Sequence, residues 1–134
     1  MLNEHAKKWI EALRSGKYKQ GLSRLHTVID GESKFCCLGV ACDLYREEVG
    51  GGWAVLPYFG RPSTSRVFFV NAETESFGGY LPPSVTKWLG LRYNDGTTYE
   101  NVTALPRLND DDKLTFEEIA DFIESQPEGL FSAE

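Results

Sequence analysis

The sequence predicts an α+β fold, a single domain over residues 1–134 in which N- and C-terminal helices pack with a small antiparallel sheet. Its length is typical of one domain. Apolar residues recur at helical spacing near both ends, and short β-branched and aromatic runs lie between them. Strands and helices do not alternate as βαβ units, so a doubly wound parallel sheet is not expected.

The first third of the chain predicts two helices. Asn3 can cap a helix over residues 3–15, whose apolar positions follow the 3.6-residue period and which ends at Gly16. Leu22, Leu25 and Val28 then indicate a short turn or strand that enters Asp30-Gly31. The run 35–49 predicts a second helix with a wide buried face, which a run of three glycines ends.

The middle of the chain predicts strands. Residues 53–56 and 66–71 are β-branched and aromatic, and proline, glycine and asparagine bound them. A third strand near 99–102 is a further candidate.

Two helices are predicted in the last third. Pro82 and Pro83 open a short helix that Gly90 closes. Thr115, followed three residues later by Glu118, forms a capping box before the final helix. That helix has an apolar stripe and ends before a proline; the stripe contains Phe116, Ile119, Ala120, Phe122 and Ile123.

Charge is distributed unevenly along the chain. The net charge is −6. Residues 1–50 carry eight Lys and Arg against seven Asp and Glu, whereas residues 51–134 carry six against thirteen. Such asymmetry can mark an anionic partner at one end, although solvated charged faces that keep the protein soluble would give the same pattern. Because bulk nucleic-acid binding needs a broad basic surface, it is not expected here.

The sequence predicts a cytoplasmic protein without a membrane partner. No stretch reaches the length of a membrane span, and the first residues lack the apolar run of a signal peptide. The three cysteines are an odd number, so they cannot close a complete disulfide framework. We expect reduced thiols.

The cysteines are candidates for catalysis as well as for packing. Cys36 and Cys37 lie at a predicted helix N-terminus, where a thiol pKa can be lowered. A nucleophilic thiol also needs a base, and both histidines lie upstream of the cysteines. The interpretation favoured by the sequence is that Cys36, Cys37 and Cys42 pack as small apolar groups.

No metal or cofactor is expected. The cysteines lack the paired spacing of a zinc site, and residues 109–112 do not continue as an EF-hand loop. The glycines at 50–52 lack the lysine of a phosphate-binding loop.

A basic segment over residues 14–24 is the strongest candidate binding site. It combines four cations, a tyrosine, two serines and two glycines, which are the parts needed to bind phosphate. The predicted ligand-binding residues are Arg14, Lys17, Tyr18, Lys19, Ser23, Arg24 and, as a second aromatic ring able to stack on a base, Trp88.

Four blocks of the sequence resemble a family of small uncharacterised proteins encoded by bacteriophages and prophages. These blocks are residues 12–18, 35–44, 81–85 with 88–91, and 108–110 with 116–123. The resemblance implies a phage accessory protein that acts in the host bacterial cytosol. Small phage proteins often counter host defence by binding a nucleotide signal or a host protein.

Three hypotheses follow. The first is a non-catalytic counter-defence protein that sequesters a small phosphorylated ligand, such as a signalling nucleotide. The second is an acidic protein that inhibits a host enzyme by binding or nucleic-acid mimicry, through Asp110, Asp111, Asp112, Glu117, Glu118 and Asp121. The third is a cysteine-dependent hydrolase that uses Cys36 or Cys37 with His26 and Asp43.

Overall fold

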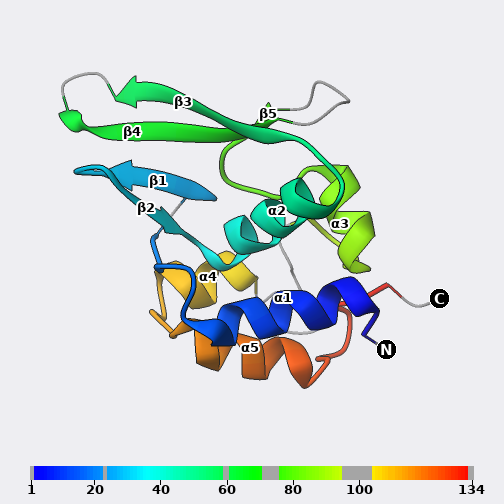
Figure 1. The fold of residues 1–134 in the computed structure, drawn as a ribbon. Helices are drawn as coiled ribbons and strands as arrows, with labels where there is room; N and C mark the ends of the chain where they lie inside the picture. Colours follow the sequence, from blue (N-terminus) through cyan, green and yellow to red (C-terminus); the bar gives the residue numbers. More distant parts are fainter. Residues whose placement is uncertain (1, 23, 59–60, 71–75, 95–103, 133–134) are drawn as a thin grey trace.

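The computed structural model describes residues 2–22, 24–58, 61–70, 76–94 and 104–132 and confirms the α+β architecture (Figure 1). The elements are α1 (Glu4–Ser15), β1 (His26–Ile29), β2 (Glu32–Phe35), α2 (Cys37–Glu48), β3 (Gly52–Tyr58), β4 (Arg61–Val70), β5 (Ser76–Phe77), α3 (Pro83–Leu89), α4 (Leu105–Asp110) and α5 (Phe116–Glu124). The strand predicted near 99–102 lies outside the described residues.

The sheet is antiparallel throughout. Its strands lie in the order β2-β1-β4-β3, and the short β5 pairs with β4. The turn between β1 and β2 consists of Asp30 and Gly31, which have φ angles of 53° and 78°. Two consecutive positive φ angles are typical of the two-residue turns that match the twist of a hairpin. The Asp-Gly pair therefore sets the β1–β2 register.

Caps set the ends of α1 and α5. The Asn3 side chain accepts a hydrogen bond from the Ala6 N–H at 2.8 Å, and Gly16 ends α1 with φ 79°. The predicted capping box of α5 is confirmed: Thr115 Oγ1 accepts from the Glu118 N–H at 3.1 Å, and Glu118 accepts from the Thr115 N–H at 2.9 Å. Local sequence therefore specifies both helices.

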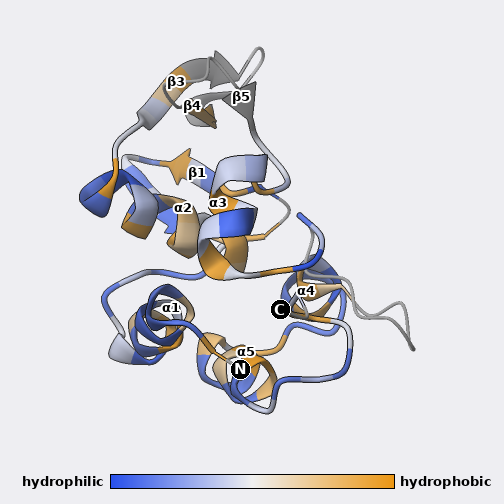
Figure 2. Ribbon diagram, turned by 90° about the vertical axis from the view of Figure 1, so that its right-hand side faces the viewer, coloured by the Kyte–Doolittle hydropathy of each residue, from blue (hydrophilic) through white to orange (hydrophobic). Residues whose placement is uncertain are grey.

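The elements form three layers (Figure 1). The sheet lies on one side, α2 and α3 lie in the middle, and α1, α4 and α5 lie on the far side. Figure 2 shows the same order after a quarter turn, with hydrophobic positions on α2, α3 and α5. The terminal helices α1 and α5 pack on each other, and α1 also packs on α2. The terminal helices therefore pack with the sheet through α2.

The middle helix α2 is buried over its first two turns. The Trp9 indole of α1 is fully buried and donates to the Cys37 carbonyl at 2.9 Å. On another side of α2, a Cβ placed on Gly39 would lie 1.7 Å from the Leu25 carbonyl oxygen. The glycine thus lets the chain before β1 lie directly on α2.

Candidate functional site

Asp43 is a buried carboxylate at the centre of a polar network on α2. Its Oδ1 accepts hydrogen bonds from Arg46 Nε at 2.8 Å and from the Trp53 indole at 2.9 Å. Its Oδ2 accepts from the Tyr18 hydroxyl at 2.7 Å. Burial pushes the pKa of Asp43 up, but the hydrogen bonds from Arg46, Trp53 and Tyr18 more than offset it, so the pKa is lower than the ordinary aspartate value. Asp43 is therefore ionised at neutral pH.

The pKa of Tyr18, in the same network, is shifted in the opposite direction to that of Asp43. Burial, followed by the hydrogen bond to Asp43, raises the pKa of Tyr18. The phenol is therefore a neutral hydrogen-bond donor at any physiological pH, and Phe35 packs against its ring edge-on at 5.1 Å between centroids.

A surface hollow of about 560 Å³ opens beside this network. We call it the lysine hollow, and its described lining is Gly16, Lys17, Tyr18, Lys19, Glu32, Ser33, Phe35 and Asp43. The loop after α1, strand β2 and helix α2 each contribute to it. Its volume lies within the range of small-molecule sites, about 300–1,000 Å³.

Two lysines line the hollow and remain largely exposed. The Lys17 side chain is 61% exposed and its ammonium lies 3.6 Å from Glu47. The Lys19 side chain is 59% exposed and pairs with Glu32, lowering the pKa of that carboxyl through the hydrogen bond. Exposed ion pairs contribute at most about 1 kcal/mol, so both ammonium groups can exchange their partner for a phosphate.

The two predicted arginines lie elsewhere. Arg14 on α1 forms ion pairs with Asp121 at 2.6 Å and Glu124 at 2.8 Å, and so joins α1 to α5. Arg24 lies over the Phe68 ring, with its guanidinium carbon 4.7 Å from the ring centroid. Neither arginine is among the described lining residues of the lysine hollow.

Trp88 is also remote from the basic loop. Its ring stacks on His5 at 4.3 Å between centroids and meets Tyr45 edge-on at 5.3 Å. His5 lies in the first turn of α1, whereas Lys17 follows its last turn, so the two places are separated by most of a helix about 18 Å long. Ser23, the remaining predicted ligand residue, lies outside the described residues.

The structure therefore brings together Lys17, Tyr18 and Lys19 from the predicted set and adds Asp43, Phe35 and Ser33 to them. Asp43 entered the sequence analysis only as part of a catalytic set. The available signal was its position between Cys42 and Leu44, two residues of the predicted buried face of the second helix, because a carboxylate that is buried in a protein is nearly always paired.

The cysteines are poorly placed for nucleophilic catalysis. Cys36 is 3% exposed, and Cys37 and Cys42 are fully buried. Burial raises the pKa of Cys36 to about 11, although the Gly39 and Leu38 amide groups offset part of the effect. Burial likewise raises the pKa values of Cys37 and Cys42 well above the ordinary value. Thiols in this environment stay protonated and act as small apolar groups.

Within the described residues, no group of three or more His, Cys, Asp or Glu side chains is placed to bind a metal ion.

Residues 109–112, which were compared above with an EF-hand loop, lie at the C-terminal end of α4. Asn109 there is fully buried and accepts a hydrogen bond from Gln20 at 2.8 Å while donating to the Gly21 carbonyl at 2.8 Å. These two hydrogen bonds join Asn109 to Gln20 and Gly21, the two residues that follow Lys19 of the lysine hollow.

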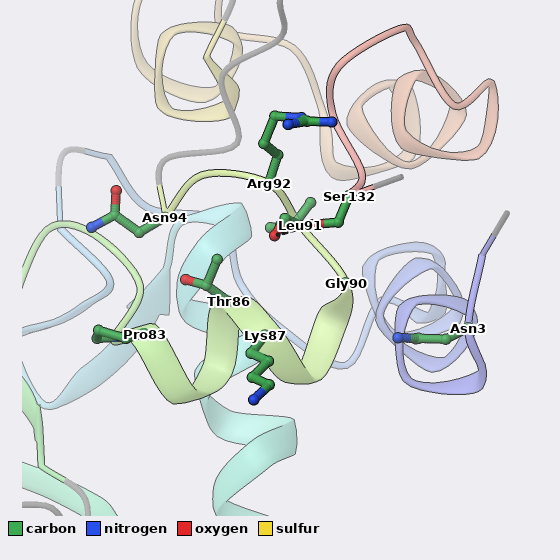
Figure 3. A pocket seen from close by; sticks show the side chains of 9 residues that line it. All are labelled: Asn3, Pro83, Thr86, Lys87, Gly90, Leu91, Arg92, Asn94 and Ser132. Carbon is green, nitrogen blue, oxygen red and sulfur yellow. Dashed lines mark hydrogen bonds between the residues drawn. The ribbon is translucent and has the colours of Figure 1, made fainter. Parts of the chain in front are cut away.

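A second hollow of about 710 Å³ runs beside α3 (Figure 3). It contains two cations, Lys87 and Arg92, whose side chains point in opposite directions in Figure 3. Two of its polar side chains already serve the fold: the Asn3 side chain caps α1 and donates to the Trp88 carbonyl, and Thr86 donates to Pro82. Among the described lining residues of this hollow, therefore, no two cations converge on a place for a phosphate.

No helix in the described parts of the chain is long and apolar enough to cross a membrane.

Comparison with curated proteins finds no match, and comparison with solved structures finds none either. A family model described as "Domain of unknown function (DUF8296)" matches residues 1–127, which is most of the chain. The chain belongs to the DUF8296 family.

Proposed function

We propose that the protein is a non-catalytic binding protein that captures a small phosphorylated ligand, such as a nucleotide, in the lysine hollow. One observation carries the proposal: Lys17 and Lys19, both more than half exposed, line one hollow of ligand size beside an ionised carboxylate. Ammonium groups form charge-assisted hydrogen bonds with phosphate that are roughly twice as strong as neutral ones. The flanking glutamates hold the lysines only through exposed ion pairs.

Binding without chemistry is supported by the surrounding groups. The thiols of the described chain are buried with raised pKa values, and Tyr18 and Asp43 hold each other in fixed protonation states. In the phage context that the resemblance implies, capture alone would withdraw a signalling nucleotide from a host defence pathway.

Isothermal titration calorimetry with ribose 5-phosphate and a panel of linear and cyclic nucleotides tests the proposal. The wild-type protein should bind at least one of them more tightly than about 1 mM. Replacing Lys17 and Lys19 together by alanine should weaken binding at least tenfold, because two charged hydrogen-bond donors are lost.

The matched control removes the same charge from other places. Lys7 and Lys113 are both exposed, and neither lines the lysine hollow. The double variant Lys7→Ala, Lys113→Ala should bind like the wild type. Absence of binding throughout the panel, or equal weakening in the two double variants, would overturn the proposal.

The acidic-inhibitor hypothesis has a separate readout. Helix α5 exposes Glu117, Glu118, Asp121 and Glu124, but Arg14 already pairs with the last two. A nucleic-acid mimic should retain a host protein from bacterial lysate in a salt-sensitive way. A nucleotide-binding protein should not.

A further inference from the structure

We infer that Asp43 makes the lysine hollow selective for nucleotides with an amino group at C6 of a purine or C4 of a pyrimidine, adenine and cytosine, over those with a carbonyl at the same position. The inference rests on the proposed function and adds the class of base to it. The observation behind it is that one hollow holds two lysines near its opening and a carboxylate in its wall.

The carboxylate has unused acceptor capacity. An ionised carboxylate offers about four acceptor positions on its two oxygens. Oδ1 accepts two hydrogen bonds, from Arg46 and Trp53, whereas Oδ2 accepts one from Tyr18 among the described residues. The Asp43 side chain is 10% exposed, and Asp43 is part of the hollow's lining. The carboxylate therefore has an acceptor position left on Oδ2 for one further N–H donor, whereas a bidentate donor edge such as that of guanine would also need the occupied Oδ1.

The Tyr18 side chain contacts both the Lys17 ammonium group and the Asp43 carboxylate. Lys17 Nζ lies 5.5 Å from the centroid of the Tyr18 ring, and the hydroxyl of that ring donates to Asp43 at 2.7 Å. A ligand that contacts both must carry its anion and its N–H donor at opposite ends. Nucleoside monophosphates have this arrangement.

Two aromatic side chains, Tyr18 and Phe35, form the wall between the two ends and pack edge to face with each other. Each is at most 9% exposed, so the wall contributes little stacking to a base. Discrimination must then come from Asp43. It accepts from the amino group of adenine or cytosine, whereas the ring N–H of hypoxanthine or uracil lies beside a carbonyl oxygen that the carboxylate repels. Aspartate accepting from the cytosine amino group is a known pairing in base recognition.

Two pairs of nucleotides isolate this contact. AMP and IMP differ by an amino group against a carbonyl on the same ring position, and CMP and UMP differ in the same way. Competition calorimetry should show AMP and CMP binding about tenfold or more tightly than IMP and UMP. Ribose 5-phosphate, which has no base, should bind more weakly than AMP but remain sensitive to the loss of Lys17 and Lys19.

The variant Asp43→Asn tests the residue itself, because an amide can donate to a carbonyl as well as accept from an amino group. Asp43→Asn should bring the affinity ratios of AMP to IMP and of CMP to UMP to about one. Asp112→Asn is the control, since it makes the same change at an exposed carboxylate outside the described lining of the hollow, and it should keep the preference. The wild-type ratios decide the matter even where Asp43→Asn does not fold.

The outcomes separate the inference from the proposed function. Equal binding within each pair, with binding still dependent on Lys17 and Lys19, overturns the selectivity and leaves the proposed function standing. A folded Asp43→Asn protein that keeps the preference also overturns it. Absence of binding by every nucleotide and by ribose 5-phosphate overturns both.

Discussion

His26 lies in an aromatic cluster beside the Asp43 network. Its ring stacks on Phe35 at 4.1 Å between centroids and meets Trp53 edge-on at 4.7 Å. Both ring nitrogens are buried, and neither has a hydrogen-bond partner among the described residues. Burial lowers the pKa of His26, and the nearby charge of Asp43 offsets only part of that effect. The fold therefore requires the neutral imidazole.

This requirement predicts a pH dependence of stability. Since the pKa of His26 is lower in the folded than in the unfolded protein, its contribution is complete above the unfolded value of about 6.5. It should decline as the pH falls from there toward the folded pKa, by at most about 1.4 kcal/mol per pH unit for one proton. Urea unfolding between pH 8 and pH 5 measures the slope.

Two variants test whether His26 causes this loss of stability at low pH. His26→Phe keeps an aromatic ring between Phe35 and Trp53 and should flatten the curve between pH 7 and pH 5. His5→Gln changes the other histidine, which lies in the first turn of α1 and stacks on Trp88. This variant should keep the decline in the free energy of unfolding. A decline that survives in His26→Phe would contradict this assignment. The lowered pKa of Asp43 produces a separate loss of stability at more acidic pH.

Individual site residues were only partly predictable. A cluster of cations in the sequence indicates which side chains are basic, but the partner of each cation depends on which helix lies beside it. Arg14 faces α5 and is paired there, whereas Lys17, three residues later, is past the end of α1 and reaches the hollow. That difference comes from the packing of α1 on α5, which the local sequence does not specify.

At the scale of elements, the contact between α2 and the chain before β1 depends on Gly39. Alanine normally stabilises a helix relative to glycine by about 1 kcal/mol. Here the added methyl group would lie 1.7 Å from the Leu25 carbonyl oxygen, so either α2 or the segment at Leu25 must move. We expect Gly39→Ala to lower the free energy of unfolding by about 3 kcal/mol or more, measured by urea denaturation.

Gly52 provides the control for this substitution. A Cβ at Gly52 meets nothing within 4 Å, and its φ is not in the left-handed region. Gly52→Ala should change stability by less than about 1 kcal/mol. A Gly39→Ala protein as stable as the wild type would show that α2 does not approach Leu25 as closely as described.

The elements with strong local signals were predictable, and those without were not. The caps at Asn3 and Thr115 and the apolar stripes set α1 and α5 within a residue or two of the predicted ends. Strand β2 was missed because its polar residues 32–34 show little apolar alternation, although the Asp-Gly turn before it was a hairpin signal. Helix α4 was missed because it is only six residues long.

At the scale of the whole molecule, the three-layer arrangement buries all three cysteines. Cys36 and Cys37 lie where α2 begins, and the Cys37 thiol donates to the Leu105 carbonyl of α4 at 3.8 Å. The sequence predicted a sheet and terminal helices that pack together, but not that α2 lies between them. A wide apolar face on the second helix is compatible with either arrangement, and only the tertiary contacts distinguish the two.

Burial of the thiols predicts their reactivity. In the native protein at neutral pH, a thiol reagent such as 5,5′-dithiobis(2-nitrobenzoic acid) should label none of the three cysteines rapidly. Labelling should follow the opening of the structure and accelerate with urea in parallel with unfolding. A cysteine that reacts rapidly without denaturant would contradict this prediction and restore the cysteine-hydrolase hypothesis.

Ligand binding in the lysine hollow can be observed residue by residue in an NMR titration. Adding AMP to the isotope-labelled protein should shift the backbone amide signals of Gly16–Lys19 and Ser33 and the indole N–H signal of Trp53, which donates to Asp43. Signals around Lys87 and Arg92 beside α3 should stay in place. Shifts that gather beside α3, or no shifts with AMP or any other nucleotide of the panel at millimolar concentration, would contradict ligand binding in the lysine hollow.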